Sequence, residues 1–112
     1  MICGAFCDIY GRNLRNAFLE TILVYRDIDF AACTVVDRIE ISKPKAYELV
    51  YEYEKKGYIE KSRILGKTQL YKLNKKNLRV KLLMKAFKDC LKLIAEEYEE
   101  KEIAVKAAKK KK

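Results

Sequence analysis

The sequence contains no histidine, and no Cys-x-x-Cys pair occurs among its four cysteines. Zinc sites that mix cysteine with histidine are therefore excluded. The sequence also has no glycine-rich phosphate loop and no paired carboxylates in an apolar setting, and its cysteines have no neighbouring base that would support them as nucleophiles. We therefore expect no enzyme activity, no bound metal and no cofactor.

Two of the cysteines stand close together in the sequence. Cys3 and Cys7 are four residues apart and could share one face of a helix, where they would form a disulfide or half of a metal site in a dimer. Free cysteine otherwise behaves as a small apolar residue. We favour the apolar role over the other two.

Long hydrophobic segments are also missing. No run approaches the roughly 18 apolar residues of a membrane-spanning helix, and the short apolar start at residues 2–6 has no basic leader and is followed by Asp8. One proline and four glycines are too few for a disordered or linker-rich chain. We expect a cytoplasmic protein that folds as one domain, residues 11–75, with an N-terminal extension at residues 1–10 and no membrane partner.

The formal net charge of +9 is unevenly distributed along the chain. Residues 1–41 carry four basic and six acidic side chains, whereas residues 42–81 carry twelve basic and four acidic ones. Positive charge concentrated on one segment attracts polyanions. Nucleic acid is therefore the expected partner, and an anionic membrane surface is the lesser alternative.

Two helices are expected before the basic segment. Between Gly11 and Tyr25, apolar residues recur at the steps of three and four that are typical of an amphipathic helix, at Leu14, Ala17, Phe18, Ile22 and Tyr25. Phe30 then leads through a short extended segment into a second helix, at about Ala31 to Glu40. The buried side of this second helix is expected to consist of Val35, Val36 and Ile39.

The segment 42–57 has clear signals for the start and the end of a helix. Ser42 is a good N-cap, Pro44 has no backbone donor to lose in the first turn, and Gly57 ends the helix. The apolar stripe of this helix contains Ala46, Leu49, Val50 and Tyr53. The opposite side mixes tyrosines with charges, which favours binding over simple solvation; its candidate binding residues are Ser42, Lys43, Lys45, Tyr47, Glu48 and Tyr51.

A β-hairpin is expected after this helix. The segments Tyr58–Arg63 and Thr68–Leu73 alternate apolar and polar residues, and Gly66 marks the turn between them. The residues expected to face the core are Ile59, Leu70 and Leu73. The side chains expected to be free for contacts with phosphates are Lys61, Arg63, Lys67, Gln69 and Lys72.

A last helix is expected over residues 76–103, capped by Asn74. It carries an apolar stripe formed by Leu83, Phe87, Cys90, Leu91, Ile94 and Tyr98. Such a stripe has to be covered. The helix could fold back onto the first helix, but we favour pairing with the same helix of a second subunit, and residues 104–112 form a basic tail.

The order of these signals resembles archaeal winged helix-turn-helix transcriptional regulators of the broad MarR/ArsR-like kind. The resemblance covers about residues 11–80 and rests on two motifs, the helix start Ser42-Lys43-Pro44 and the strand sequence Gly-Lys-Thr-Gln-Leu-Tyr-Lys-Leu-Asn at residues 66–74. It implies an α+β, mostly helical fold, with a two-stranded wing and a long C-terminal dimerisation helix.

The resemblance also implies a function. In such regulators the helix after the turn reads the major groove, which by position falls on Lys43, Lys45, Tyr47, Glu48 and Tyr51. The wing contacts the DNA backbone or the minor groove, which falls on Arg63, Lys67 and Gln69. We therefore expect a homodimeric, sequence-specific regulator that binds double-stranded DNA. The alternative is a winged-helix module for protein interaction or non-specific nucleic-acid binding. The absence of histidine departs from metal-sensing members and argues against a metal-sensor role.

Overall fold

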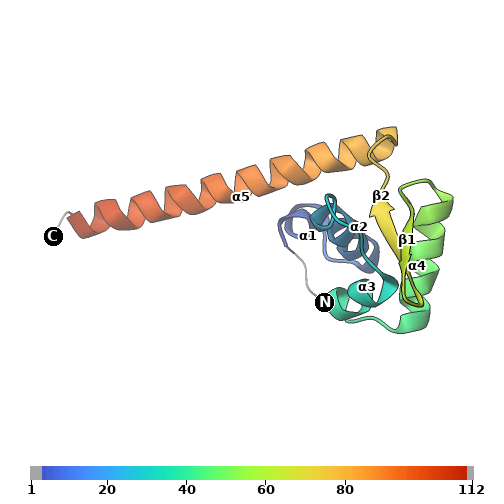
Figure 1. Ribbon diagram of the computed structural model, residues 1–112. Coiled ribbons are helices and arrows are strands. Elements are labelled where there is room, and N and C mark those ends of the chain that lie inside the picture. Colours follow the sequence, from blue (N-terminus) through green and yellow to red (C-terminus); the bar gives the residue numbers. More distant parts are fainter. Residues whose placement is uncertain (1–3, 111–112) are drawn as a thin grey trace.

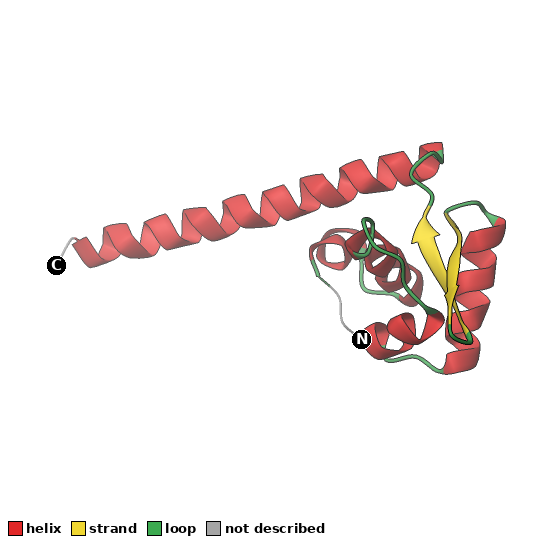
Figure 2. Ribbon diagram, in the orientation of Figure 1, coloured by secondary structure: helices red, strands yellow, loops and turns green. Residues whose placement is uncertain are grey.

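Residues 4–110, which the computed structural model describes, form five helices and one two-stranded sheet (Figures 1 and 2). Side chains are described for residues 4–99. In chain order the elements are α1 (Ala5–Tyr10), α2 (Leu14–Val24), α3 (Ala32–Ile39), α4 (Lys43–Lys55), β1 (Ile59–Leu65), β2 (Thr68–Leu73) and α5 (Leu78–Lys110).

The hairpin formed by β1 and β2 lies between α4 and the preceding helices. β1 contacts α4, β2 contacts α2, and α3 packs on both α2 and α4. Figure 1 shows α4 at the outer edge of the domain, whereas α5 passes over α1 and α2 and then projects beyond them. This projection makes the molecule elongated, with extents of 62 × 29 × 25 Å.

One apolar core joins all seven of these elements. Phe18 of α2 lies at its centre and stacks on Tyr53 of α4, with ring centroids 5.0 Å apart. Burying a side chain of this size stabilises a fold by about 1.5–3 kcal/mol. The inner side of α4 is therefore held in place by the core, through Ala46, Leu49, Val50 and Tyr53.

The helices expected before the basic segment are present at nearly the expected positions. α2 begins after Asn13, whose side chain accepts a hydrogen bond from the backbone N–H of Asn16 at 2.9 Å. α3 ends at Ile39, and Glu40 adopts a left-handed backbone conformation with φ 55°. This conformation is uncommon for a residue other than glycine. It reverses the chain so that α4 starts only three residues later.

Helix α1 is not predicted by the sequence pattern, because it is only six residues long. Its Phe6 and Cys7 are buried in the core, and α1 contacts both α2 and α5. The carboxylate of Glu20, whose residue is only 4% exposed, accepts hydrogen bonds from the backbone N–H groups of Gly4 at 2.6 Å and Cys7 at 3.2 Å. A carboxylate in this position satisfies N–H groups that have no partner within the helix. The pairing considered for Cys3 lies outside the described residues.

The expected hairpin is present, but β1 starts one residue later and ends two residues later than predicted. Gly66, with φ 64°, occupies the first position of the two-residue turn, as in type II′ hairpin turns. The register shifts between Lys61 and Ile64, because Lys61 pairs with Tyr71 and Ile64 pairs with Gln69. Two residues of β1 therefore oppose one residue of β2 in a β-bulge.

The expectation that Leu70 faces the core is wrong. Leu70 and Leu73 are three residues apart, so the two-residue period of a strand places them on opposite faces. Tyr71 and Leu73 are the buried residues of β2, and Leu70 is half-buried. Tyr71 also exchanges two backbone hydrogen bonds with Phe30, at 2.8 and 2.7 Å. The extended segment predicted at Phe30 therefore attaches the region before α3 to the wing.

The start of α5 is capped by Asn77 and not by Asn74. The side-chain oxygen of Asn77 accepts hydrogen bonds from the backbone N–H groups of Arg79 at 2.8 Å and Val80 at 3.3 Å. Asn74 instead belongs to the turn before the helix, where its side-chain oxygen accepts from the N–H of Lys76. The side chains of both asparagines also donate to the carbonyl oxygen of Gly57, at 2.9 and 3.0 Å. This junction joins the end of α4 to the start of α5.

The apolar stripe of α5 is divided between two environments. Phe87 and Cys90 are buried, and Leu83 packs against the same core, so this part of the stripe is covered by the helices of its own chain. Leu91 and Tyr98 are exposed, and Ile94 is half-buried. The helix continues to Lys110, so residues 104–110 of the expected tail are helical.

Two further findings concern metals and membranes. Within the part of the chain that the structure describes, no three cysteine or acidic side chains gather closely enough to hold a metal ion. None of the described helices combines the length and the apolar character that crossing a membrane requires.

We predict that Glu20→Ala lowers the free energy of unfolding by about 2 kcal/mol, because two backbone N–H groups at the start of α1 lose their acceptor. Urea unfolding followed by circular dichroism measures this change. Glu96→Ala, on the exposed part of α5, is the matched control and should change stability by less than about 0.5 kcal/mol. Equal losses in the two variants would contradict a specific role for Glu20.

Candidate nucleic-acid interface

The outer side of α4, formed by Lys43, Lys45, Tyr47, Glu48 and Tyr51, is available to a partner. Tyr47 is 52% exposed and Tyr51 is 63% exposed, although both are large aromatic residues. Ser42 caps the helix as expected, because its hydroxyl accepts a hydrogen bond from the N–H of Lys45 at 3.3 Å. The side chains on this helix face are therefore presented from a well-defined helix start.

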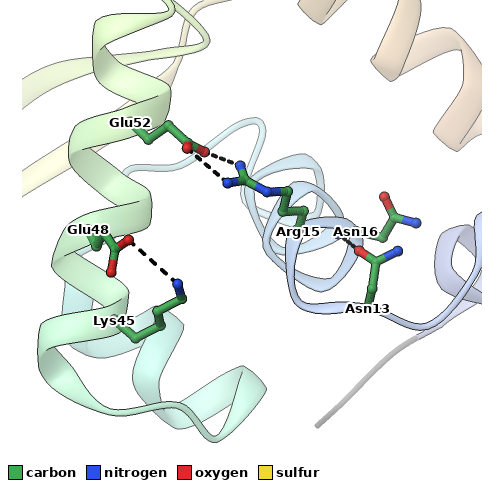
Figure 3. Close-up of polar contacts among 6 residues, drawn as sticks. All are labelled: Asn13, Arg15, Asn16, Lys45, Glu48 and Glu52. Carbon is green, nitrogen blue, oxygen red and sulfur yellow. Dashed lines mark hydrogen bonds and ion pairs between the residues drawn. The ribbon is translucent and has the colours of Figure 1, made fainter.

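Ion pairs orient two carboxylates along α4, as Figure 3 shows. The Lys45 ammonium lies 3.6 Å from the Glu48 carboxylate within the helix. Glu52 is paired with the guanidinium of Arg15 on α2, which donates two hydrogen bonds to it. The hydrogen bonds from Arg15 lower the pKa of Glu52 and keep it charged. Because this pair joins α2 to α4, it orients α4 relative to the rest of the domain.

The basic side chains of the wing, which consists of β1 and β2, are only partly free. Arg63 is paired with Asp29 in the loop before α3, with Nε 2.8 Å from the carboxylate, and Ser62 donates to the same oxygen. Lys72 lies 3.6 Å from Glu60 on the neighbouring strand. The expectation that Arg63 and Lys72 are both free for phosphates is therefore wrong. Among the described side chains, Lys61 and Lys67 are exposed cations of the wing without an ion-pair partner.

Gln69 also differs from its expected role as a free side chain. It is half-buried, and its amide nitrogen donates to the backbone carbonyl oxygens of Arg63 at 3.1 Å and Leu70 at 2.8 Å. Arg63 lies in the β-bulge, where the regular ladder between β1 and β2 is interrupted. Gln69 therefore stabilises the irregular part of the wing instead of reaching outward.

A cleft of about 270 Å³ connects α4 with the wing. Lys43 and Tyr47 line it from α4, and Lys67 lines it from the turn of the wing. The lining residues that the sequence did not single out for binding come from α3 with the residue before it and from β2, namely Ala31, Ala32, Cys33, Val36, Thr68 and Tyr71. The pairing of Phe30 with Tyr71 brings these segments together, and no local sequence signal specifies that pairing.

The contact with Asp29 neutralises the positive charge of Arg63 on the wing. The hydrogen bond from Arg63 lowers the pKa of the Asp29 carboxyl from its usual value of 3.8. Because the folded-state pKa is below the unfolded one, the pair stabilises the fold above about pH 4, and this contribution is lost as the pH falls through the folded-state pKa. At neutral pH the wing is therefore tied to the loop before α3.

Comparison with solved structures identifies the architecture. HlyU from Vibrio cholerae superposes with a TM-score of 0.53 and 19% sequence identity, over 66% of this chain and 75% of that chain. A mutant of ZitR from Lactococcus lactis superposes with a TM-score of 0.58 and 12% identity, over 80% of this chain and 60% of that chain. The chain folds as a winged helix.

Sequence comparison adds no closer relationship. No protein-family profile matches the chain, and no curated protein matches it. Because the identities to HlyU and ZitR are below 20%, the likeness shows the winged-helix fold with its long C-terminal helix and nothing about individual side chains. Only the geometry of this chain therefore indicates which side chains bind a partner.

We predict that the Asp29 carboxyl titrates below 3.8 and that Arg63→Ala returns its pKa towards 3.8, because the largest cause of the shift is the hydrogen bond from Arg63. Carboxyl carbon chemical shifts followed by NMR against pH measure both values. Lys61→Ala removes a cation of the same strand that does not contact Asp29, and it should leave the titration unchanged. A pKa that is insensitive to Arg63 would mean that the pair is not formed in solution.

Proposed function

We propose that this chain is a sequence-specific, double-stranded DNA-binding transcription regulator that acts as a homodimer. In this proposal α4 enters the major groove and the wing contacts the DNA backbone. The observation that carries the proposal is the outer side of α4, where exposed tyrosines, lysines and a carboxylate stand on a helix whose inner side is fixed in the core.

The shape of this surface suits duplex DNA. The major groove is about 12 Å wide and admits an α-helix. α4 lies at the edge of the domain (Figure 1), and Tyr47 and Tyr51 on its outer side are more than half exposed. The cleft places Lys67 of the wing near Lys43 of α4, which allows the two elements to contact one stretch of phosphate backbone.

The side chains of α4 divide into two roles under this proposal. Lys43 and Lys45 lie in the first turn, where the positive end of the helix dipole adds to their charge and favours phosphate contact. Tyr47, Glu48 and Tyr51 lie further along the helix and face base edges. A carboxylate such as Glu48 can accept a hydrogen bond from cytosine N4, and each good contact is worth about 1–3 kcal/mol of discrimination.

The structural neighbours support this assignment at the level of fold. HlyU and ZitR are winged-helix transcription regulators. One fold can serve several functions. The positive charge of residues 42–81 and the exposed side of α4 therefore support the proposal from this chain's own residues.

The second subunit is proposed on α5. Leu91 and Tyr98 are exposed beyond the point where the chain's own helices cover the stripe, and Ile94 between them is half-buried. Spacings of three and four residues place these three side chains on one face of the helix. Pairing this face with its copy would remove the apolar area from water and bring two α4 helices to successive half-sites.

Selection of bound duplexes from a random pool at physiological salt tests the proposed function. We expect one enriched palindromic sequence, because two copies of α4 related by a two-fold axis read the same bases in opposite directions. Retention of DNA without any enriched sequence would support the alternative of a non-specific nucleic-acid module. A chain that retains no DNA would support the protein-interaction alternative.

Variants of α4 locate the contact. Lys43→Ala and Lys45→Ala should each weaken binding and each reduce the dependence of log affinity on log salt by roughly one. Lys88→Ala and Lys92→Ala remove the same charges from exposed positions of α5 and serve as matched controls. If the α5 variants weakened binding as much as the α4 variants, the effect would be one of net charge and α4 would not be the contact.

The dimer is tested by the double variant Leu91→Glu with Tyr98→Glu. Four carboxylates would then face one another across the two-fold axis, so we expect dissociation of the dimer and weaker DNA binding. Sedimentation measures the mass of both proteins at micromolar concentration. The control is Leu82→Glu with Leu93→Glu, which alters exposed leucines on another face of α5 and should leave the dimer intact. A monomeric wild type would overturn the proposed dimer, and a dimer disrupted only by the control would place the interface on another face of α5.

A further inference from the structure

The tip of the wing exposes two large aliphatic side chains. Ile64 is 67% exposed and Leu65 is 62% exposed, at the end of a strand whose other exposed residues are polar or charged. Gly66 follows them, and a Cβ built there would meet no atom within 4 Å apart from its two chain neighbours. Within the described part of the chain, most of the surface of both aliphatic side chains is therefore open to solvent.

The register of the hairpin distributes these side chains over both faces of the wing. Ile64 pairs with Gln69, and Leu65 pairs with Thr68 at the last position before the turn. Neighbouring residues of a strand point to opposite faces. The tip is therefore an aliphatic edge in which each face of a narrow β-ribbon carries one large apolar side chain.

The surroundings of the tip favour a polyanion over an apolar protein partner. Lys61 and Lys67 flank the two aliphatic residues, and no acidic residue occurs between Glu60 and the end of β2. Lys67 also lines the cleft that it shares with Lys43 and Tyr47. The apolar tip is thus continuous with the surface that we assign to DNA.

We propose that Ile64 and Leu65 act as an apolar wedge that enters the minor groove beside the major groove occupied by α4, and that they kink the duplex there. This inference rests on the proposed binding of double-stranded DNA by α4 and the wing. It adds an activity, DNA bending, and it assigns a role to two residues that make no phosphate contact.

The dimensions explain why insertion deforms the DNA. The minor groove of B-form DNA is about 6 Å wide, whereas a β-ribbon with side chains on both faces is about 10 Å thick. The groove has to widen before the tip can enter. Apolar side chains that insert between base steps partly unstack them and bend the duplex by about 20–90° towards the major groove.

The wedge also produces sequence preference at a position that α4 does not reach. Pyrimidine–purine steps such as TA and CA unstack more easily than other steps. A flexible step should therefore recur at a fixed distance from the bases read by α4. No hydrogen bond to these bases is required, because the preference arises from the energy of deformation.

The test compares wild type with the double variant Ile64→Ser and Leu65→Ser on one duplex labelled with a dye at each end. The duplex carries the enriched sequence if selection yields one, and a mixed sequence containing TA steps if it does not. Energy transfer between the dyes should rise when wild type binds, because bending brings the ends together. The double variant should bind about tenfold more weakly and leave the duplex straight. Its salt dependence should equal that of wild type, because no charge is removed.

Two controls separate the wedge from other effects of the wing. Ile28→Ser removes an aliphatic side chain that is 60% exposed in the loop between α2 and α3, and it should preserve both affinity and bending. Lys67→Ala should weaken binding and reduce the salt dependence but keep the bend. Thermal unfolding of the double variant should match that of wild type, because both replaced side chains lie in solvent.

The outcomes distinguish failure of the wedge from failure of the proposed function. If wild type binds an enriched sequence but leaves it straight, or if the double variant bends it equally, the wedge is wrong and the proposed function stands. If wild type bends duplexes without sequence preference, the wedge is supported and sequence-specific regulation is not. If wild type binds no duplex, both proposals fall. A change in sedimentation of the double variant without DNA would show that the tip packs against a second copy, which also overturns the wedge.

Discussion

The relative positions of α4, the wing and α5 depend on the hydrogen bonds that the carbonyl oxygen of Gly57 accepts. This oxygen accepts hydrogen bonds from the side chains of Asn74 and Asn77 at 2.9 and 3.0 Å. α4 ends just before Gly57, β1 starts just after it, and Asn77 caps α5. The two elements that contact DNA under the proposed function, and the helix that contacts the second subunit, therefore share one polar junction. The direction in which α5 leaves the domain is tied through it to the direction of α4, so the proposed second subunit and the proposed DNA are geometrically coupled.

Ion pairs determine how much of the positive charge faces outward. Arg15, Arg63 and Lys72 are each engaged by a carboxylate of the same chain. Exposed pairs of this kind contribute little to stability. Their effect here is on position, because the Arg15 pair aligns α2 with α4 and the Arg63 pair holds the wing against the loop before α3. Of the described cations without a carboxylate partner, Lys43 and Lys67 lie where α4 and the wing approach each other.

Local signals were sufficient for every element except the six-residue helix α1, and insufficient for the contacts between elements. The Ser42 cap and the glycines at 57 and 66 predicted α4 and the hairpin, because caps and turns depend on residues that are adjacent in the chain. The contacts missed from the sequence join distant residues: Glu20 with the start of α1, Arg63 with Asp29, and Tyr71 with Phe30. A net charge counted along the sequence could not show that Arg63 already has a partner. The cap at Asn77 was missed for a different reason, since Asn74 and Asn77 offer the same chemistry three residues apart.

The pairing of Asp29 with Arg63 gives the wing its own internal counter-ion. The carboxylate neutralises Arg63 and holds the wing against the loop before α3. Under the proposed function, a wing that is already held in one orientation loses less conformational entropy when DNA binds. A phosphate that replaces Asp29 leaves a carboxylate without its cation beside a polyanion, which is unfavourable. A non-specific contact with a charged surface therefore gains little free energy from Arg63. Under the proposed function, only DNA that also forms the contacts of α4 offsets the free energy that is lost when the pair of Asp29 and Arg63 is broken. Under the proposed function, Asp29 therefore makes the response of this basic surface to polyanions selective.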